Sequence, residues 1–188
     1  MFYEHVDTAV IDGESLPWIP FTPYAENVLL KYFKLVPIRG EWIVMMKSPI
    51  DMQLPKHHHT GTVMVYTIEG QWKYKEHDWT AGPGSIVYET AGSTHTPEVV
   101  STGSTDGYVL TLVQVNGDLA FLDGNDNIVA LENWKSGLHR YLAYCEQHDI
   151  APKDLTAFNR VTDIAAKNTN RAGAPKRSPP SLELFEKG

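Results

Sequence analysis

Seven short stretches between residues 29 and 122 are rich in Val, Ile, Tyr, Trp and Thr, and turn-forming residues separate them. β-branched and aromatic residues favour extended strands, and no helical pattern lies between these stretches. The stretches are residues 29–35, 42–47, 62–68, 71–75, 85–88, 108–115 and 118–122. This pattern predicts an all-β sandwich or small barrel.

Glycine-containing turns punctuate these stretches. Glu69-Gly70 lies between two of them and predicts a tight hairpin, and Asn116-Gly117 and the segment 123–126 (DGND) predict two more bends of this kind. The segment 81–84 (AGPG), with two glycines and a proline, is expected to form neither helix nor strand.

Both ends of the chain differ from this β-rich centre. Residues 1–28 are rich in Pro, Asp and Glu and are expected to form an irregular arm, followed by a barrel over 29–130. Residues 131–148 carry apolar side chains at helical spacing, so 131–166 is predicted as a helical segment, with a shorter helical turn near 153–158. Residues 167–188 then form a basic tail. Two such arms favour a homodimer or homotetramer.

Charge and cysteine content exclude several classes of protein. The chain has 16 Lys and Arg against 23 Asp and Glu, a net charge of −7, which argues against nucleic acid or an anionic membrane as partner. No apolar run reaches the roughly 18 residues needed to span a bilayer, and the acidic N-terminus does not resemble a secretory signal. A single cysteine, Cys145, excludes an intrachain disulfide and suits a reducing cytoplasm.

A histidine cluster is the main chemical signal. His57-His58-His59 precedes one of the predicted strands, and residues two apart in extended chain share a face, so His57 and His59 can converge while His58 points away. A third histidine, His95, follows the bend Ala91-Gly92. Neutral imidazoles bind Fe, Cu, Ni and Zn, and three of them leave positions open for a substrate.

The spacing around these histidines resembles the two motifs of the cupin superfamily. In the first motif, HxH is followed by Glu and then Gly, and this chain has His57, His59 and Gly70 but Val63 at the Glu position. In the second motif, Gly84 is followed by Thr90-Ala91-Gly92 and His95, with Thr90 in place of the usual Pro. The resemblance implies a jelly-roll barrel (double-stranded β-helix) and a three-histidine site.

Four segments resemble more narrowly the 2,4'-dihydroxyacetophenone dioxygenase family of cupins: KYFKLVPIRGEW, LPKHHHTGTV, YTIEGQWKYKEHDWTAGPGS and YETAGSTHT. That family is similar to acetylacetone-cleaving dioxygenases and to the cupin domains of anti-sigma factors. The resemblance implies Fe(II) held by His57, His59 and His95, although Zn, Ni, Cu or Mn also bind such a site. It further implies a small ketone and O2 as substrates, with C–C cleavage next to the carbonyl to a carboxylic acid and formate.

The role of Glu89 stays open between two interpretations. The resemblance makes it a carboxylate that orients a ligand histidine or takes a substrate proton, with a pKa raised by an apolar site. It can equally be a solvent-facing strand residue. Glu69 is assigned to a turn, His58 to the outer face, and Cys145 to the buried face of the helix.

Aromatic residues and function also leave alternatives. Six aromatic side chains can line a pocket for an aryl ketone, or fill the barrel or a dimer interface: Tyr66, Trp72, Tyr74, Trp79, Tyr88 and Phe121. The favoured function is the ketone-cleaving dioxygenase. The alternatives are a β-diketone dioxygenase, another metal-dependent cupin enzyme such as an isomerase, and a non-enzymatic metal-binding or sensory cupin.

Overall fold

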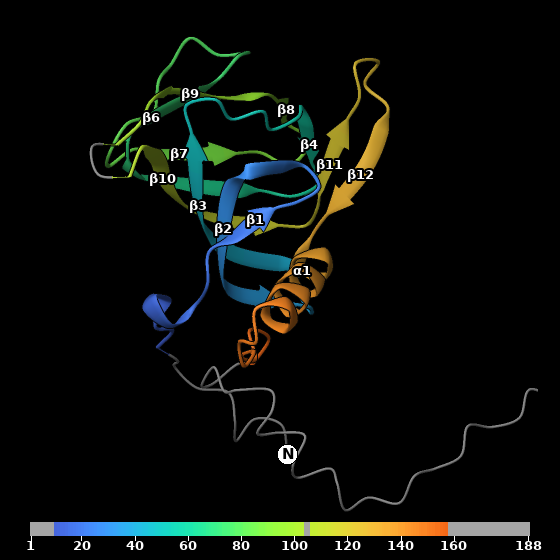
Figure 1. Ribbon diagram of the computed structural model, residues 1–188. Helices are drawn as coiled ribbons and strands as arrows, with labels where there is room; N and C mark the ends of the chain where they lie inside the picture. Colours follow the sequence, from blue (N-terminus) through green and yellow to red (C-terminus); the bar gives the residue numbers. More distant parts are fainter. Residues whose placement is uncertain (1–9, 104–105, 158–188) are drawn as a thin grey trace, which may run out of the picture.

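Antiparallel strands are the main secondary structure of the molecule (Figure 1). The computed structural model describes residues 10–103 and 106–157. The elements, in chain order, are a 3-10 helix (Gly13–Ser15), β1 (Ile19–Phe21), β2 (Ala25–Val36), β3 (Glu41–Pro49), β4 (His57–His59), β5 (Val63–Glu69), β6 (Gln71–Tyr74), β7 (Ile86–Glu89), β8 (Thr94–His95), β9 (Pro97–Ser101), β10 (Tyr108–Asn116), β11 (Leu119–Leu122), β12 (Ile128–Glu132) and α1 (Trp134–Gln147).

The strands form three sheets around one core. The orders are β1-β2-β3-β10-β5-β7, β12-β11-β4-β8 and β6-β9. Strands from all three sheets contribute side chains to a single internal cavity, so the sheets together enclose a barrel. The prediction of an all-β barrel is therefore confirmed.

Strand β10 illustrates why the sequence folds in this way. Its residues alternate between buried and partly exposed, and Val109, Val113 and Val115 face the core. The strand pairs with β3 over nine residues without a register shift, from Tyr108 opposite Pro49 to Asn116 opposite Glu41. Burial that alternates from one residue to the next is typical of a strand with one face in the core.

One of the three predicted hairpins is confirmed and two are wrong. The turn at 123–126 joins β11 to β12, which pair antiparallel. Glu69-Gly70 and Asn116-Gly117 instead connect strands that lie in different sheets. Gly70 has a φ of +78°, and a Cβ there would lie 2.8 Å from the Val109 side chain, so the residue permits a sharp corner of the barrel.

The predicted irregular arm over residues 1–28 needs correction. Strand β1 and the first residues of β2 lie within it, and Ile19 and Phe21 are buried in the core. Pro20 stands between them at the edge of the sheet, where a strand tolerates proline because the missing N–H has no partner to lose. The sequence did not predict β1 because the surrounding residues are rich in Pro, Asp and Glu.

Helix α1 begins three residues later than predicted. Asn133 caps it, accepting from the backbone N–H groups of Lys135 and Ser136, while Ser136 Oγ accepts from the Asn133 N–H. The residues before Asn133 belong to β12. The helix packs on β2, with Tyr141 and Cys145 buried, as predicted for Cys145. Within the described residues, no helix is both long and apolar enough to cross a membrane.

Residues 151–157 do not form the predicted helical turn. Leu155 is fully buried, and its carbonyl accepts a hydrogen bond from the Leu35 N–H at 3.0 Å, so this segment is held against β2 in a non-helical conformation. The boundary at residue 166 and the tail 167–188 lie outside the described residues.

Candidate metal centre

Strand β4 positions the histidine cluster. His57 and His59 are buried, and His58 between them is half-buried and turned away, bonding Thr94 Oγ1 through its Nδ1 at 2.9 Å. Strand β8 pairs with β4 so that His95 stands directly opposite His57. One ring nitrogen from each of His57, His59 and His95 lies within 4.8 Å of the others. The structure therefore brings together the three histidines selected from the sequence.

The surroundings of His57 keep its ring neutral and fixed. Burial, with a smaller contribution from His59, lowers the pKa of His57 to about 3. Its Nδ1 donates to the Pro55 carbonyl at 3.0 Å, which leaves Nε2 with a free lone pair. A neutral imidazole oriented through its other nitrogen is the usual form of a histidine metal ligand.

Glu89 is buried, so it is not the solvent-facing strand residue of the alternative interpretation. Its Oε2 lies 2.9 Å from His59 Nε2 and 3.4 Å from His95 Nε2, and Tyr74 donates its phenolic O–H to Oε1. Sequence reasoning pointed to Glu89 but missed this hydrogen bond from Tyr74.

The expectation of a raised pKa for Glu89 is wrong. Burial alone would raise it, but the hydrogen bonds from His59, His95 and Tyr74 stabilise the carboxylate more strongly and hold its pKa at about 2. The carboxylate also stabilises the protonated phenol, so that burial and Glu89 together raise the pKa of Tyr74 well above its usual value.

The donor atoms fit a divalent cation. His59 Nε2 lies 2.8 Å from His95 Nε2 as well as 2.9 Å from Glu89. A neutral imidazole carries one proton on its two nitrogens, so this nitrogen can donate to only one of these neighbours. Nitrogen and carboxylate lone pairs thus converge where a bound cation would satisfy them together. His57, His59 and His95 could hold such an ion, with Glu89 beside them.

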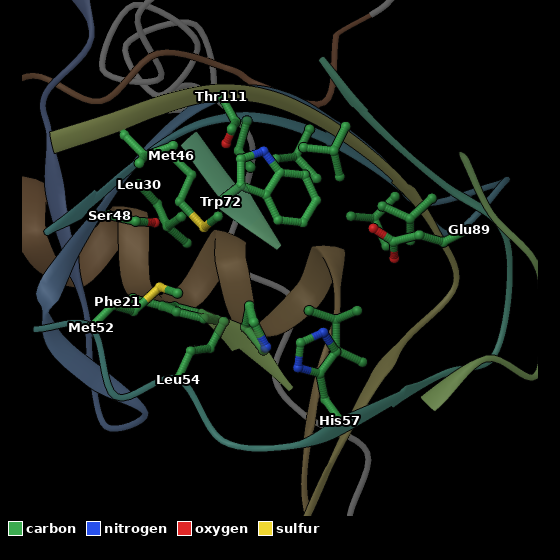
Figure 2. A pocket seen from close by; sticks show the side chains of 18 of the residues that line it. Phe21, Leu30, Met46, Ser48, Met52, Leu54, His57, Trp72, Glu89 and Thr111 are labelled. Carbon is green, nitrogen blue, oxygen red and sulfur yellow. The ribbon is translucent and has the colours of Figure 1, made fainter. Parts of the chain in front are cut away.

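An internal cavity of about 80 Å³ adjoins these residues (Figure 2). His57, His59 and Glu89 line one part of it, and most of the remaining wall is apolar. Two of the six predicted aromatic residues, Trp72 and Tyr74, line the cavity. Phe121 is buried in the core, where its ring packs edge-on against His57 at 5.8 Å.

The other three aromatic residues from the sequence analysis do not line this cavity. Tyr66 and Tyr88 are exposed on the outer face of the large sheet. Trp79 packs against His77 outside the cavity. Aromatic side chains thus form part of the cavity wall, but only two of the six aromatic residues named from the sequence contribute to it.

Comparison with known proteins decides the family. A model described as the ChrR cupin-like domain matches residues 6–114. The chain belongs to this ChrR cupin-like family. Cupin relatives among solved structures agree: an RmlC-like cupin protein from Ralstonia eutropha JMP134 is 51% identical and covers 84% of this chain and 99% of its own, with a TM-score of 0.79.

More distant cupins share the fold. A cupin-like protein of unknown function from Ralstonia eutropha JMP134 is 22% identical over 74% of this chain and 86% of its own, with a TM-score of 0.66. An acetylacetone dioxygenase from Acinetobacter johnsonii is 17% identical over 73% of this chain and 91% of its own, with a TM-score of 0.62. No curated protein sequence matches the chain. The cupin fold expected from the motifs is thus confirmed.

Proposed function

We propose that this cupin is a non-haem Fe(II) dioxygenase that cleaves a C–C bond next to a carbonyl. The proposed substrate is an α-hydroxyketone of the 2,4'-dihydroxyacetophenone type, and the products are a carboxylic acid and formate. The observation that carries the proposal is the cluster of three buried histidines, two of which line an apolar internal cavity. The acetylacetone dioxygenase of the same fold supports oxygenase chemistry on this scaffold.

His57, His59 and His95 would hold the ion. Bound there, Fe(II) would supply a Lewis acid that holds the ketone oxygens beside O2. Three neutral imidazoles leave the ion's charge of +2 uncompensated, and the nearby Glu89 carboxylate reduces the net charge of the site to +1. A singly deprotonated, bidentate ketone would then make the site neutral, and this charge balance favours an enolate or α-hydroxyketone anion as the bound form.

The protein's own groups would position the reactants and exclude water. The Pro55 carbonyl fixes the ring of His57, and Tyr74 fixes the carboxylate of Glu89. Glu89 Oε2 lies 2.9 Å and 3.4 Å from the Nε2 atoms of His59 and His95, the nitrogens that would bind the ion, so the carboxylate is placed to neutralise the ion's charge. The apolar wall keeps bulk water away from the reacting carbon.

The identity of the metal, the cellular compartment and the oligomeric state also form part of the proposal. Zn, Ni, Cu or Mn would bind the same donors, and a reducing cytoplasm would favour Fe(II). We also propose a homodimer or homotetramer, because apolar side chains lie exposed on two strands at sheet edges, Ile86 and Tyr88 on β7 and Ile128 and Val129 on β12.

Oxygen uptake by anaerobically Fe(II)-loaded protein tests the proposal. The panel is 2,4'-dihydroxyacetophenone, acetylacetone and simple α-hydroxyketones, with His57→Ala and His95→Ala as inactive variants and His58→Ala as the matched control. Uptake with an α-hydroxyketone by the wild type and His58→Ala alone is expected. Uptake restricted to acetylacetone would favour the β-diketone alternative. No uptake at full metal occupancy would overturn the oxygenase and favour a non-enzymatic or isomerase cupin.

A further inference from the structure

One side chain in the cavity wall breaks the apolar pattern of its strand. The inward-facing residues of β10 are Val109, Thr111, Val113 and Val115, and all four line the cavity. Thr111 is 2% exposed, and its Oγ1 has no hydrogen-bond partner among the described residues. Buried hydroxyls are almost always paired, so an unpaired one that faces a cavity indicates a partner from outside the chain.

A threonine on the neighbouring strand provides a contrast. Thr67 of β5 stands opposite Thr111 and is fully buried, but its Oγ1 accepts a hydrogen bond from Trp72 Nε1 at 2.8 Å. Thr67 does not line the cavity. The fold therefore satisfies the hydroxyl that faces protein and leaves unsatisfied the one that faces the cavity.

The position of Thr111 relative to the histidines suggests what its partner is. Figure 2 shows Thr111 and Ser48 in one part of the cavity, and His57 and Glu89 away from them in another. Ser48 is also buried and lies on β3, opposite Val109. Much of the wall between these two polar regions is apolar, including Trp72. An ordered water near Thr111 would need two to four polar partners, and in this part of the wall Ser48 is the one other polar residue among the lining residues that Figure 2 labels.

We propose that Thr111 anchors the far end of the substrate, which therefore carries a hydrogen-bonding group, such as a hydroxyl, opposite its metal-binding ketone. The proposal rests on the proposed function and narrows its substrate class. A small aryl ketone with a ring hydroxyl has this pattern, with one polar group at each end and an apolar body. A β-diketone with alkyl ends lacks the second polar group and would leave Thr111 unpaired.

Paired ligands test the anchor by binding, without turnover. The probes are 2,4'-dihydroxyacetophenone and 2-hydroxyacetophenone, which differ only in the ring hydroxyl, titrated calorimetrically into anaerobic Fe(II)-loaded protein. The wild type is expected to bind the ring-hydroxylated probe about 10-fold more tightly, the effect of one buried hydrogen bond. Thr111→Val should reduce this preference to about twofold or less, and Thr111→Ser, which keeps the hydroxyl, should retain it. Equal binding of both probes by the wild type, an unchanged preference in Thr111→Val, or no binding of either probe would overturn the proposal.

A stability measurement on the metal-free protein provides a second readout. Valine has the shape of threonine without the buried unpaired hydroxyl, so Thr111→Val is expected to raise Tm by about 2–4 °C. A lower Tm would mean that Thr111 has a partner within the protein, and would overturn the proposal. A preference for the ring-hydroxylated probe without O2 uptake would leave the anchor standing and contradict the proposed function. O2 uptake with equal binding of the two probes would contradict the anchor and leave the proposed function standing.

Discussion

Val63 and Glu89 stand directly opposite each other in the antiparallel pairing of β5 and β7. Val63 occupies the position where the first cupin motif has its glutamate, yet a buried carboxylate still reaches His59 and His95 from the neighbouring strand. The acidic group beside the histidines thus comes from β7, and not from the motif position on β5.

Glu89→Gln is expected to weaken metal binding by about 10- to 100-fold, because it removes the negative charge that lies beside the metal-facing nitrogens of His59 and His95. The amide has nearly the same shape but no charge to stabilise the cation. The measurement is a competition titration with a metal-sensitive dye. Tyr74→Phe, which removes only the hydrogen bond to Glu89, should have a smaller effect in the same direction. Unchanged affinity in Glu89→Gln would show that the carboxylate has no part in holding the metal.

His57→Ala and His95→Ala should lose the metal, because each removes one of the three converging nitrogens. The adjacent His58 faces away from the cluster and bonds Thr94, so His58→Ala serves as the matched control. Elemental analysis after metal loading and gel filtration should give close to one equivalent of metal for the wild type and His58→Ala and far less for the other two. Equal stoichiometry in all four proteins would place the metal elsewhere.

The metal-free protein should lose stability as the pH falls below neutral. The pKa of His57 is about 3 in the folded state against 6.5 normally, so the unfolded state takes up a proton first, from about pH 6.5 downward. Glu89 adds to this effect below about pH 4.5, because its folded pKa of about 2 is also depressed. Urea unfolding at pH 7.5, 6.5, 5.5 and 5 should show the free energy of unfolding falling toward a limiting slope of about 1.4 kcal/mol per pH unit for one such group. His57→Asn should flatten the curve between pH 6.5 and 5, and a wild-type curve that is flat in this window would refute the assignment.

Away from the cavity, Arg140 and Glu132 form a buried ion pair that joins α1 to β12. Two guanidinium nitrogens of Arg140 contact the fully buried carboxylate at 2.5 and 2.8 Å, and one also bonds the Tyr32 hydroxyl. Arg140→Leu should lower the free energy of unfolding by about 3–5 kcal/mol, because it leaves an uncompensated buried charge. Adding Glu132→Leu should recover part of this loss in denaturant unfolding. A cost below about 1 kcal/mol for the single change would contradict the account.

The sequence was sufficient to predict the features that depend on local pattern. A run of β-branched and aromatic residues identified β10, and the spacing of two histidines in extended chain, with a third after a glycine bend, identified the cluster. Features that depend on neighbours distant in sequence were not predictable in this way. Gly70 and Gly117 resemble hairpin glycines, and only the assembled sheets show that they turn corners between sheets.

The chemistry of Glu89 and Thr111 also depended on tertiary structure. A buried carboxylate is expected to have a raised pKa, and the reversal at Glu89 depends mainly on hydrogen bonds from His59 and His95, with a smaller contribution from Tyr74 on β6. Thr111 is an ordinary strand residue in the sequence, and its unpaired hydroxyl becomes visible only when the cavity it faces is known. Strand β1 was missed because Pro20 masks its apolar alternation.

Isotope labelling tests the central claim most directly. Fe(II)-loaded protein is given 2,4'-dihydroxyacetophenone under 18O2, and both products are analysed by mass spectrometry. Cleavage of the bond between the carbonyl carbon and its neighbour, with one oxygen atom delivered to each fragment, predicts one 18O in the aryl carboxylic acid and one in formate. Products without label, or an intact ketone despite full metal occupancy, would contradict the claim that this cupin is a C–C-cleaving dioxygenase.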